Sequence, residues 1–199
     1  MSDQRRKWIT LSSQTVFGNR WIEVKSYKTI APTGAAADYG LVHIRNLAIG
    51  VLPIDESGHT YLVGQERFAF DLYSWELPEG GGPRDVPPLE TAKRELAEET
   101  GLSARRWLPL LEDVHLSNSV TDERAYAFLA WDLASGADGE KDSTEDLSLR
   151  RLPFQEAVKM AVSGEITDAF SLMMLLKADY LARTGSLPEP LARVMFSQP

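Results

Sequence analysis

The sequence contains no cysteine, which excludes disulfide bonds and thiol catalysis from its chemistry. It also lacks any apolar run long enough to cross a bilayer. No basic segment followed by an apolar core and a cleavage site stands at its start, so we expect no secretion signal. Together these absences predict a cytoplasmic protein that does not associate with membranes, because a reducing compartment suits a chain without disulfides.

Basic residues are scarce, with 21 Lys and Arg against 29 Asp and Glu, and the net charge is −8. Nucleic-acid-binding proteins usually present a basic face, so we expect no nucleic-acid partner. An acidic small molecule is still a possible substrate, because metal ions and a few arginines can reverse the local field. The length of 199 residues is enough for one large domain.

Turn residues and apolar periodicity predict that short strands and helices share this chain. The expected strands are 7–11, 21–30, 39–44, 47–54, 60–63, 73–78, 108–114, 124–133 and 147–152, with 47–54 and 60–63 forming a hairpin. The expected helices are 88–100, 153–162 and 168–183. Residues 134–146 are small, polar and acidic and predict a mobile loop, and residues from 185 onward predict a loose tail. This order predicts helices packed on a mixed sheet.

Three acidic residues, Glu95, Glu98 and Glu99, fall within five positions of the expected helix 88–100, soon after the glycines at 80–82. At about 100° per residue they occupy one arc of the helix. Carboxylate oxygens that converge in this way are ligands for hard divalent cations. The glycines allow a close approach to the backbone, because they have no Cβ. The alternative is a solvated acidic face, the usual interpretation of an isolated Glu-x-x-Glu-Glu.

The spacing of Gly80, Arg94-Glu95-Leu96, Glu98-Glu99 and Gly101-Leu102 resembles the signature of the Nudix hydrolases, G-x5-E-x7-R-E-U-x-E-E-x-G-U, in which U is aliphatic. One position departs from the signature, because Val86 stands where the family has its first glutamate. In the family that glutamate mainly supports the signature arginine. The resemblance therefore implies that Arg94 takes another partner, with Glu98 and Glu90 as the two options.

Segments that flank the signature resemble the branch of the family that hydrolyses ADP-ribose and other nucleoside diphosphate sugars. These segments are Gln65-Glu66-Arg67, Trp75-Glu76-Leu77-Pro78-Glu79-Gly80-Gly81, Ser117-Asn118-Ser119-Val120-Thr121-Asp122-Glu123 and Gly164-Glu165-Ile166-Thr167-Asp168-Ala169. In the third segment Ser119 replaces the usual glycine. The resemblance covers residues 18–182, and the order of the segments is more specific than any one of them.

The resemblance implies an α/β fold, in which a Nudix-type α/β/α sandwich surrounds a mixed sheet. It places an antiparallel β subdomain at 1–45, the hydrolase domain at 46–184 and a C-terminal tail at 185–199. In relatives the N-terminal subdomain often exchanges contacts across a homodimer, so we expect a homodimer here. The implied substrate is a nucleoside diphosphate sugar.

The implied reaction is attack of a metal-activated water on one phosphorus of a pyrophosphate bridge. The products would be a nucleoside monophosphate and a sugar phosphate. The implied cofactor is Mg²⁺, with Mn²⁺ as the alternative. Its implied ligands are Glu95, Glu99 and Glu98, and the backbone carbonyl of Glu79 is a further ligand.

The resemblance also implies a general base on a late loop. Glu145 matches that position best and Glu123 is the alternative, and for each the competing interpretation is a solvated loop acid. Arg94 of the signature completes the expected catalytic set. The three histidines, of which His43 is one, share no spacing and are expected to be structural.

Several residues are expected to contact the substrate. Arg67 suits a phosphate or ribose, because its planar guanidinium favours bidentate recognition, and the alternative is a surface ion pair. Trp21 is a candidate to stack on a nucleobase, although packing in a small N-terminal core is the simpler interpretation. Glu76, Gly80 and Gly81 complete the set.

Three functions compete at this point. The first is hydrolysis of nucleoside diphosphate sugars such as ADP-ribose or GDP-mannose. The second is a non-catalytic module that binds a nucleotide, which the departure at Val86 motivates. The third is hydrolysis of another nucleotide, such as a nucleoside triphosphate or capped RNA.

Overall fold

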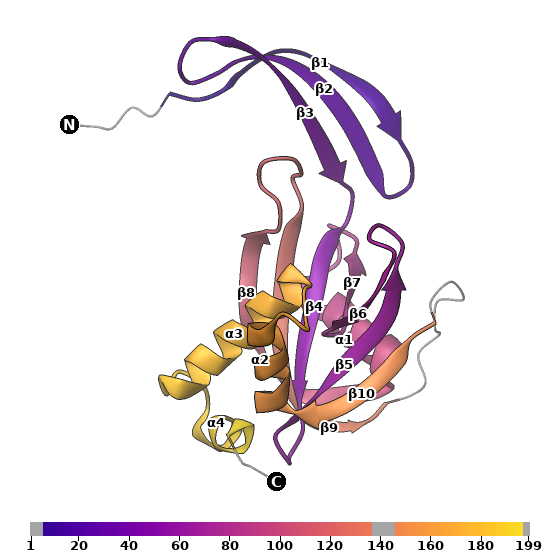
Figure 1. Cartoon of the computed structure of the whole chain (residues 1–199), viewed down its shortest axis with the longest axis vertical. Coiled ribbons are helices and arrows are strands. Elements are labelled where there is room, and N and C mark those ends of the chain that lie inside the picture. Colours follow the sequence, from indigo (N-terminus) through magenta and orange to yellow (C-terminus); the bar gives the residue numbers. More distant parts are fainter. Residues whose placement is uncertain (1–5, 137–145, 197–199) are drawn as a thin grey trace, which may run out of the picture.

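The computed structural model describes residues 6–136 and 146–196 and consists of a small antiparallel sheet joined to a layered α/β body (Figure 1). The small sheet is built from β1 (Ile9–Gly18), β2 (Ile22–Ile30) and β3 (Ala36–Ile44), in the order β1-β2-β3. Asn19 shapes the first turn, because its side-chain oxygen accepts hydrogen bonds from the backbone N–H groups of Trp21 and Ile22. The predicted N-terminal antiparallel β subdomain is therefore present.

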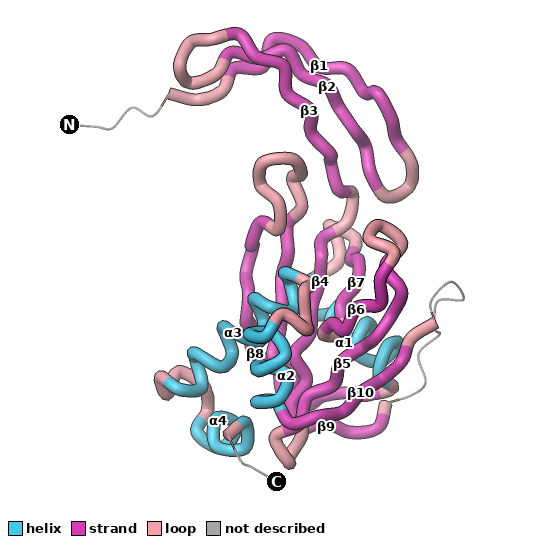
Figure 2. Tube along the Cα trace, viewed as in Figure 1, coloured by secondary structure: helices cyan, strands magenta, loops and turns pink. Residues whose placement is uncertain are grey.

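The body contains two further sheets, which Figure 2 shows side by side. The four-stranded sheet has the order β7 (Glu79–Gly82), β4 (Leu47–Ile54), β9 (Arg124–Ser135) and β8 (Leu102–His115). Its β4–β9 pair is parallel and its other pairs are antiparallel, so the predicted mixed sheet is confirmed. The three-stranded sheet has the order β10 (Ser148–Pro153), β5 (His59–Arg67) and β6 (Leu72–Glu76).

The predicted hairpin between residues 47–54 and 60–63 is wrong. The turn forms as expected, with the N–H of Gly58 donating to the carbonyl of Asp55. However, β4 pairs with β7 and β9, whereas β5 pairs with β6 and β10. The carboxylate of Asp55 accepts from the N–H of His59 and, at 2.7 Å, from Nε of Arg151 on β10. These bonds tie the start of β5 to β10, so the two strands diverge after the turn.

The helix of the signature, α1 (Pro88–Thr100), covers one face of the four-stranded sheet. It begins at a proline, which is tolerated in a first turn, and ends at Gly101, whose left-handed φ of 67° terminates it as predicted. Ala92 and Leu96 of the helix pack against Ile49 and Val51 of β4. This apolar contact fixes the acidic arc of α1 beside β7.

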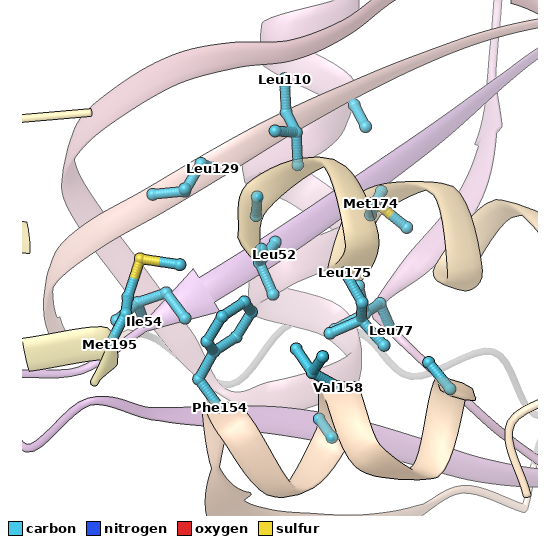
Figure 3. Close-up of a cluster of buried hydrophobic side chains, with 14 of the residues drawn as sticks. Leu52, Ile54, Leu77, Leu110, Leu129, Phe154, Val158, Met174, Leu175 and Met195 are labelled. Atoms are coloured by element: carbon cyan, nitrogen blue, oxygen red, sulfur yellow. The ribbon is translucent and has the colours of Figure 1, made fainter. Parts of the chain in front are cut away.

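Helices α2 (Phe154–Ser163) and α3 (Ala169–Arg183) cover the opposite face. Figure 3 shows Leu52 and Ile54 of β4 among Phe154, Met174 and Leu175 from these helices. β4 is thus buried on both faces, which explains its nearly continuous apolar sequence. Gly50 is required here, because a Cβ on it would lie 2.7 Å from Sδ of Met174. The predicted α/β fold is confirmed.

The expectation of a loose tail after Gly185 is wrong for the described part of that segment. Residues Glu189–Met195 form α4, and Leu187, Leu191 and Met195 are buried in the core that α2 and α3 share. Leu191 and Met195 are four apart in the helix and lie on one face of it, and Leu187 precedes the helix. The backbone of α4 also contacts the turn between β4 and β5, where a Cβ on Gly58 would meet the carbonyl oxygen of Val194 at 1.9 Å.

Several other expected elements differ in their bounds: β1, for example, spans Ile9–Gly18 rather than 7–11, and residues 79–82 form the additional strand β7. β8 starts at Leu102, directly after the end of α1, rather than at residue 108. β9 continues to Ser135, and residues 137–145 of the expected loop 134–146 lie outside the described residues. Among the described residues, no helix combines the length and the apolar character needed to cross a membrane.

The burial of α4 leads to a stability prediction. Met195 is 1% exposed, so Met195→Ala should lower the free energy of unfolding by about 2–5 kcal/mol, because it leaves a cavity in the core. Urea unfolding followed by circular dichroism measures this change. The control is Val162→Ala on α2, where the side chain is 74% exposed and a change within about 0.5 kcal/mol is expected. A Met195→Ala change as small as the control would show that α4 does not pack in solution.

Candidate active site

A cleft of about 1140 Å³ lies where the N-terminal sheet meets the body. It gathers seven of the residues that the sequence predicted as site residues: Trp21, Arg67, Glu76, Glu79, Gly80, Gly81 and Glu123. Another predicted residue, Glu145, lies outside the described residues. The remaining four, Arg94, Glu95, Glu98 and Glu99, belong to α1, which reaches the cleft lining through the glycine strand β7.

Arg67 is bound to a buried carboxylate. It stands at the end of β5, and Glu76, which is 2% exposed, lies on the neighbouring strand β6 opposite Val63, within reach of the Arg67 side chain. Nε of Arg67 donates to Oε1 of Glu76 at 2.8 Å, and its Nη2 donates to the other carboxylate oxygen. These hydrogen bonds raise the pKa of Arg67. The pair fixes the plane of the guanidinium beside the cleft, and a contact of Arg67 with a phosphate or ribose stays a prediction.

Glu79, at the start of β7, lies where negative charge accumulates. Burial, followed by the charges of Asp168, Glu76 and Glu99, raises the pKa of Glu79 well above its ordinary value of 4.5, although Arg67 opposes this effect. Nη2 of Arg67 lies 3.6 Å from Oε1 of Glu79. Within the described part of the chain, no group hydrogen-bonds to the buried Oε2 atom. We call Glu76, Glu79, Glu99 and Asp168 the acidic cluster, a site that a cation would stabilise.

The glycine strand lets α1 approach this cluster closely. A Cβ on Gly80 would lie 2.3 Å from the carboxylate carbon of Glu95, so only glycine leaves room for that side chain against the backbone. The N–H of Glu79 donates to Oε2 of Glu99 at 3.0 Å. Glu95 and Glu99 are four residues apart, and both therefore reach β7 from the same side of the helix.

Arg94 is well bonded without a glutamate at position 86. Its Nη1 donates to Oε2 of Glu98 at 2.5 Å, its Nη2 donates to the carbonyl of Gly81 at 3.0 Å, and it also contacts the carboxylate of Glu95. Of the two alternative partners that the sequence suggested, Glu98 is used, whereas Glu90 pairs with Lys93. Arg94 thus ties α1 to β7 even though Val86 cannot support it.

The chemistry of these donors fits a hard divalent cation. Glu79, Glu95, Glu98 and Glu99 offer carboxylate oxygens, which Mg²⁺ and Mn²⁺ prefer. Over the described residues, no three acidic or histidine side chains already form a metal-binding group. Arg94 and the N–H of Glu79 engage some of the same oxygens, so these side chains would turn toward a bound ion. The raised pKa of Glu79 and its buried Oε2 mark the position where positive charge is most needed.

Glu123 and Trp21 are the two remaining predicted residues that line the cleft. Burial, and then the charges of Asp122 and Asp168, raise the pKa of Glu123, which suits a group that exchanges protons. Trp21 is 54% exposed, and the guanidinium of Arg20 lies over its ring at 4.6 Å. Trp21 therefore contributes little to an N-terminal core in this structure, and stacking of its ring on a nucleobase stays a prediction.

Among the cleft residues that sequence reasoning missed, three stand out for their charge or their exposed rings: Asp168, Phe68 and Phe70. Asp168 was expected only as a helix start. It does cap α3 by accepting from the N–H of Ser171 at 2.6 Å, but its charge also acts on Glu79. Phe68 and Phe70 lie in the β5–β6 turn, line the cleft and are largely exposed. Their position directly after Arg67 was the available signal.

The charge at Glu79 leads to a prediction about pH. The pKa of Glu79 is raised in the folded protein. The contribution of Glu79 to the free energy of unfolding is therefore present at low pH and is lost as the pH rises through this raised pKa. Glu79→Gln removes that loss, so the metal-free variant should be more stable than the wild type at mildly alkaline pH. The difference should disappear at acid pH, where Glu79 is protonated.

Thermal unfolding in the presence of a chelator measures this effect. Glu66→Gln, at an exposed position of the same strand as Arg67, is the control and should change little at either pH. A wild type that is more stable than Glu79→Gln at alkaline pH would contradict the assignment of unneutralised charge to Glu79.

The comparison with known proteins agrees with this geometry. A model of the NUDIX domain matches residues 44–170. The chain is 28% identical over 194 residues to an ADP-ribose pyrophosphatase of Mycobacterium tuberculosis, covering 96% of this chain and 92% of the relative. It is 28% identical over 161 residues to an ADP-ribose pyrophosphatase of Bacillus subtilis, covering 80% and 86%.

Two other similarities extend the comparison. A CMP-5'-(N-acetyl-N-hydroxy-3-aminopropyl)phosphonate hydrolase of Streptomyces rubellomurinus is 29% identical over 170 residues, covering 85% of this chain and 81% of the relative. A crystal structure described as an ADP compounds hydrolase has a TM-score of 0.81 at 21% identity, covering 94% of this chain and all of the other, which is a similarity of fold. Because the domain model matches more than half of the chain and includes the glycine strand and α1, the protein belongs to the NUDIX domain family.

Proposed function

We propose that this protein hydrolyses the pyrophosphate bond of nucleoside diphosphate sugars, with ADP-ribose as the first candidate and GDP-mannose as the second. The observation that carries the proposal is the acidic cluster at the glycine strand, beside α1 and in one cleft with Arg67 and Trp21. A pyrophosphate has negative charges to be neutralised and a nucleoside to be stacked, and this cleft offers groups for both. Two relatives named ADP-ribose pyrophosphatase support the substrate class.

The carboxylates of Glu95, Glu98 and Glu99 and the oxygens of Glu79 would hold the divalent ion, which we propose to be Mg²⁺, with Mn²⁺ as a substitute. When bound, such an ion neutralises the charge of the pyrophosphate and lowers the pKa of water. Arg94 keeps α1 against β7 through its bond to the carbonyl of Gly81, while its bond to Glu98 lies within the helix, so the carboxylates stay near the strand.

The remaining steps belong to the side chains of the cleft. Arg67, oriented by Glu76, donates hydrogen bonds to a phosphate oxygen, and the ring of Trp21 stacks on the base. Glu123 accepts a proton from water as the water oxygen attacks phosphorus. The bond from that phosphorus to the bridging oxygen breaks, and its electron pair leaves with the second phosphate. Glu145 is the competing base and lies outside the described residues.

The direct test is hydrolysis of a nucleotide-sugar panel with Mg²⁺ or Mn²⁺, followed by phosphate release from the products with a coupled phosphatase. The wild type should cleave ADP-ribose or GDP-mannose. Glu99→Gln should lower kcat/KM at least about 100-fold, because it removes a charged ligand at the reacting phosphate.

Glu90→Gln is the matched control, since Glu90 is an exposed acid of the same helix that pairs with Lys93, and it should keep wild-type activity. If the wild type cleaves no compound of the panel with either metal, the proposed function is wrong.

One observation favours a second candidate function, a non-catalytic module that binds the nucleotide. That observation is Val86 at the first glutamate position of the signature. Because Arg94 already bonds Glu98 and Gly81, we expect Val86→Glu to change kcat/KM by less than about tenfold. Tight binding of ADP-ribose without turnover, unchanged in Val86→Glu, would instead favour the binding module. Faster cleavage of nucleoside triphosphates in the same panel would favour the third candidate.

We also propose that the protein is a homodimer whose interface includes the N-terminal sheet. Every residue of β1 is exposed, and large apolar side chains of the sheet and its ends are exposed with them, namely Trp8, Ile9, Leu11, Val16 and Phe17. A three-stranded sheet without a covered face is marginally stable in water, so a second copy that covers it would stabilise it. The cytoplasmic location expected from the sequence stays a prediction.

Sedimentation velocity tests the dimer. The wild type should sediment as a dimer at micromolar concentration, and Val16→Asp should sediment as a monomer because it places a charge on the apolar surface. Asp38→Asn, which alters an exposed ion pair with Lys28 in the same sheet, should stay dimeric. A monomeric wild type would refute the proposal.

A further inference from the structure

The connection between β8 and β9, residues 116–123, contacts the N-terminal sheet on one side and the cleft on the other. Its last residue, Glu123, lines the cleft together with Arg67 and Glu79. Figure 1 shows the connection rising from the top of β8 and β9 toward the end of β3. The contacts between this connection and β3 therefore affect the position of Glu123 in the cleft.

Backbone hydrogen bonds extend the N-terminal sheet into this connection. The N–H of Val42 donates to the carbonyl of Val120 at 2.9 Å, and the N–H of Asp122 donates to the carbonyl of Val42 at 3.2 Å. The two bonds form a parallel bridge between Val42 and Thr121. The hydroxyl of Tyr39 also donates to the carbonyl of Ser119. The connection is thus bridged to the edge strand β3 at one residue pair, Val42 and Thr121, and by the bond from Tyr39.

The carboxylate of Asp122 adds two side-chain contacts with β3 at the end of this bridge. Its Oδ1 accepts from the N–H of Ile44 at 2.9 Å, and its Oδ2 lies 2.7 Å from Nδ1 of His43. A carboxylate only accepts, so Nδ1 carries the proton. In the neutral ring, Nε2 then accepts from the hydroxyl of Tyr27, 2.6 Å away on β2. Burial alone would raise the pKa of Asp122, but the bonds from His43 and Ile44 lower it, so the carboxylate stays charged.

Glu123 follows Asp122 directly, so their Cα atoms are about 3.8 Å apart and a displacement of one displaces the other. The N–H of Glu123 donates to the hydroxyl of Thr121, within the bridged segment. Burial and the charge of Asp122 are also among the causes that raise the pKa of Glu123. The geometry of the cleft wall at Glu123 therefore depends on a contact with β2 and β3, outside the NUDIX-type sandwich.

We propose that Asp122 and His43 are positioning residues that fix Glu123 in the cleft, with Tyr27 setting the orientation of the imidazole. This inference rests on the proposed function for its kinetic consequence. A reacting group displaced by about 1 Å can lose about 100-fold in rate, so the loss of this contact should appear in turnover. His43, expected from the sequence to be merely structural, becomes a determinant of the reaction through Asp122.

The kinetic test uses the full-length protein with Mg²⁺ and ADP-ribose. Asp122→Asn should lower kcat about 10- to 100-fold with a KM within about threefold of the wild type. His43→Ala should do the same. His43→Asn, whose amide nitrogen occupies the place of Nδ1, should recover most of the loss. Asp38→Asn in the same sheet is the matched control and should keep wild-type kcat.

A double-mutant cycle separates positioning from a general structural role. If Asp122 acts through Glu123, Asp122→Asn should cost less than about twofold when it is added to Glu123→Gln. The same factor in both backgrounds would overturn the proposal, and so would an Asp122→Asn variant with wild-type kcat. A fall in the melting temperature without a fall in kcat would show that the contact only holds the connection to β3, and this result would also overturn the proposal.

A measurement without turnover keeps this inference distinct from the proposed function. Crystal structures of the wild type and of Asp122→Asn, or of His43→Ala if the first does not fold, should show the carboxylate of Glu123 displaced by about 1 Å or more. If the wild type hydrolyses no nucleotide sugar, the proposed function fails and the two structures still decide the inference. An unmoved Glu123 would overturn it.

Discussion

The arrangement of this protein depends on negative charge held close together at the start of β7. Glu79 stands there with a raised pKa, near the carboxylates of Glu76, Glu99 and Asp168. Like charges in a poorly hydrated place destabilise a fold unless cations or hydrogen bonds compensate. Arg67 provides compensation on one side of the strand, and the backbone N–H of Glu79 binds Glu99 on the other. The charge that is left uncompensated is the reason for proposing that the cluster binds a divalent ion.

The fold brings these groups together through one strand. β4 is buried on both faces, with α1 on one side and α2 and α3 on the other, so both layers are fixed relative to it. β7 pairs with β4 and therefore keeps a constant distance from α1. Gly80 leaves space for Glu95 at that distance, and Arg94 bridges helix and strand through Gly81. The acidic residues of the signature thus have their positions set by apolar packing on the far side of the helix.

The N-terminal sheet contributes to the cleft in two ways. Trp21, in the turn between β1 and β2, lines the cleft, and His43 of β3 contacts Asp122, the residue before Glu123. A dimer that covers its exposed apolar side chains would also make this sheet more rigid, because burial on a partner reduces its freedom to move. Assembly and the geometry of the cleft would then be connected through β3, the strand that both interactions share.

Some features were determined by the sequence alone. The bounds of α1 follow from Pro87-Pro88 and Gly101, and the metal-type donors follow from the spacing of Glu95, Glu98 and Glu99, because local backbone preference and the helical repeat fix both. A mixed sheet with helices was likewise readable from the order of periodic segments. Because Val86 stands in place of the signature glutamate, the sequence offered two other partners for Arg94, and the structure uses Glu98.

Only the tertiary structure decided the rest. The divergence of β4 and β5 depends on Arg151, which lies 96 residues from Asp55 along the chain. The burial of α4, the charge of Asp168 on Glu79 and the contact of His43 with Asp122 likewise join segments that no local pattern relates. Sequence periodicity indicates which residues of an element face a core. These features depend instead on contacts between residues far apart in the sequence, and such contacts are set only when the whole chain packs.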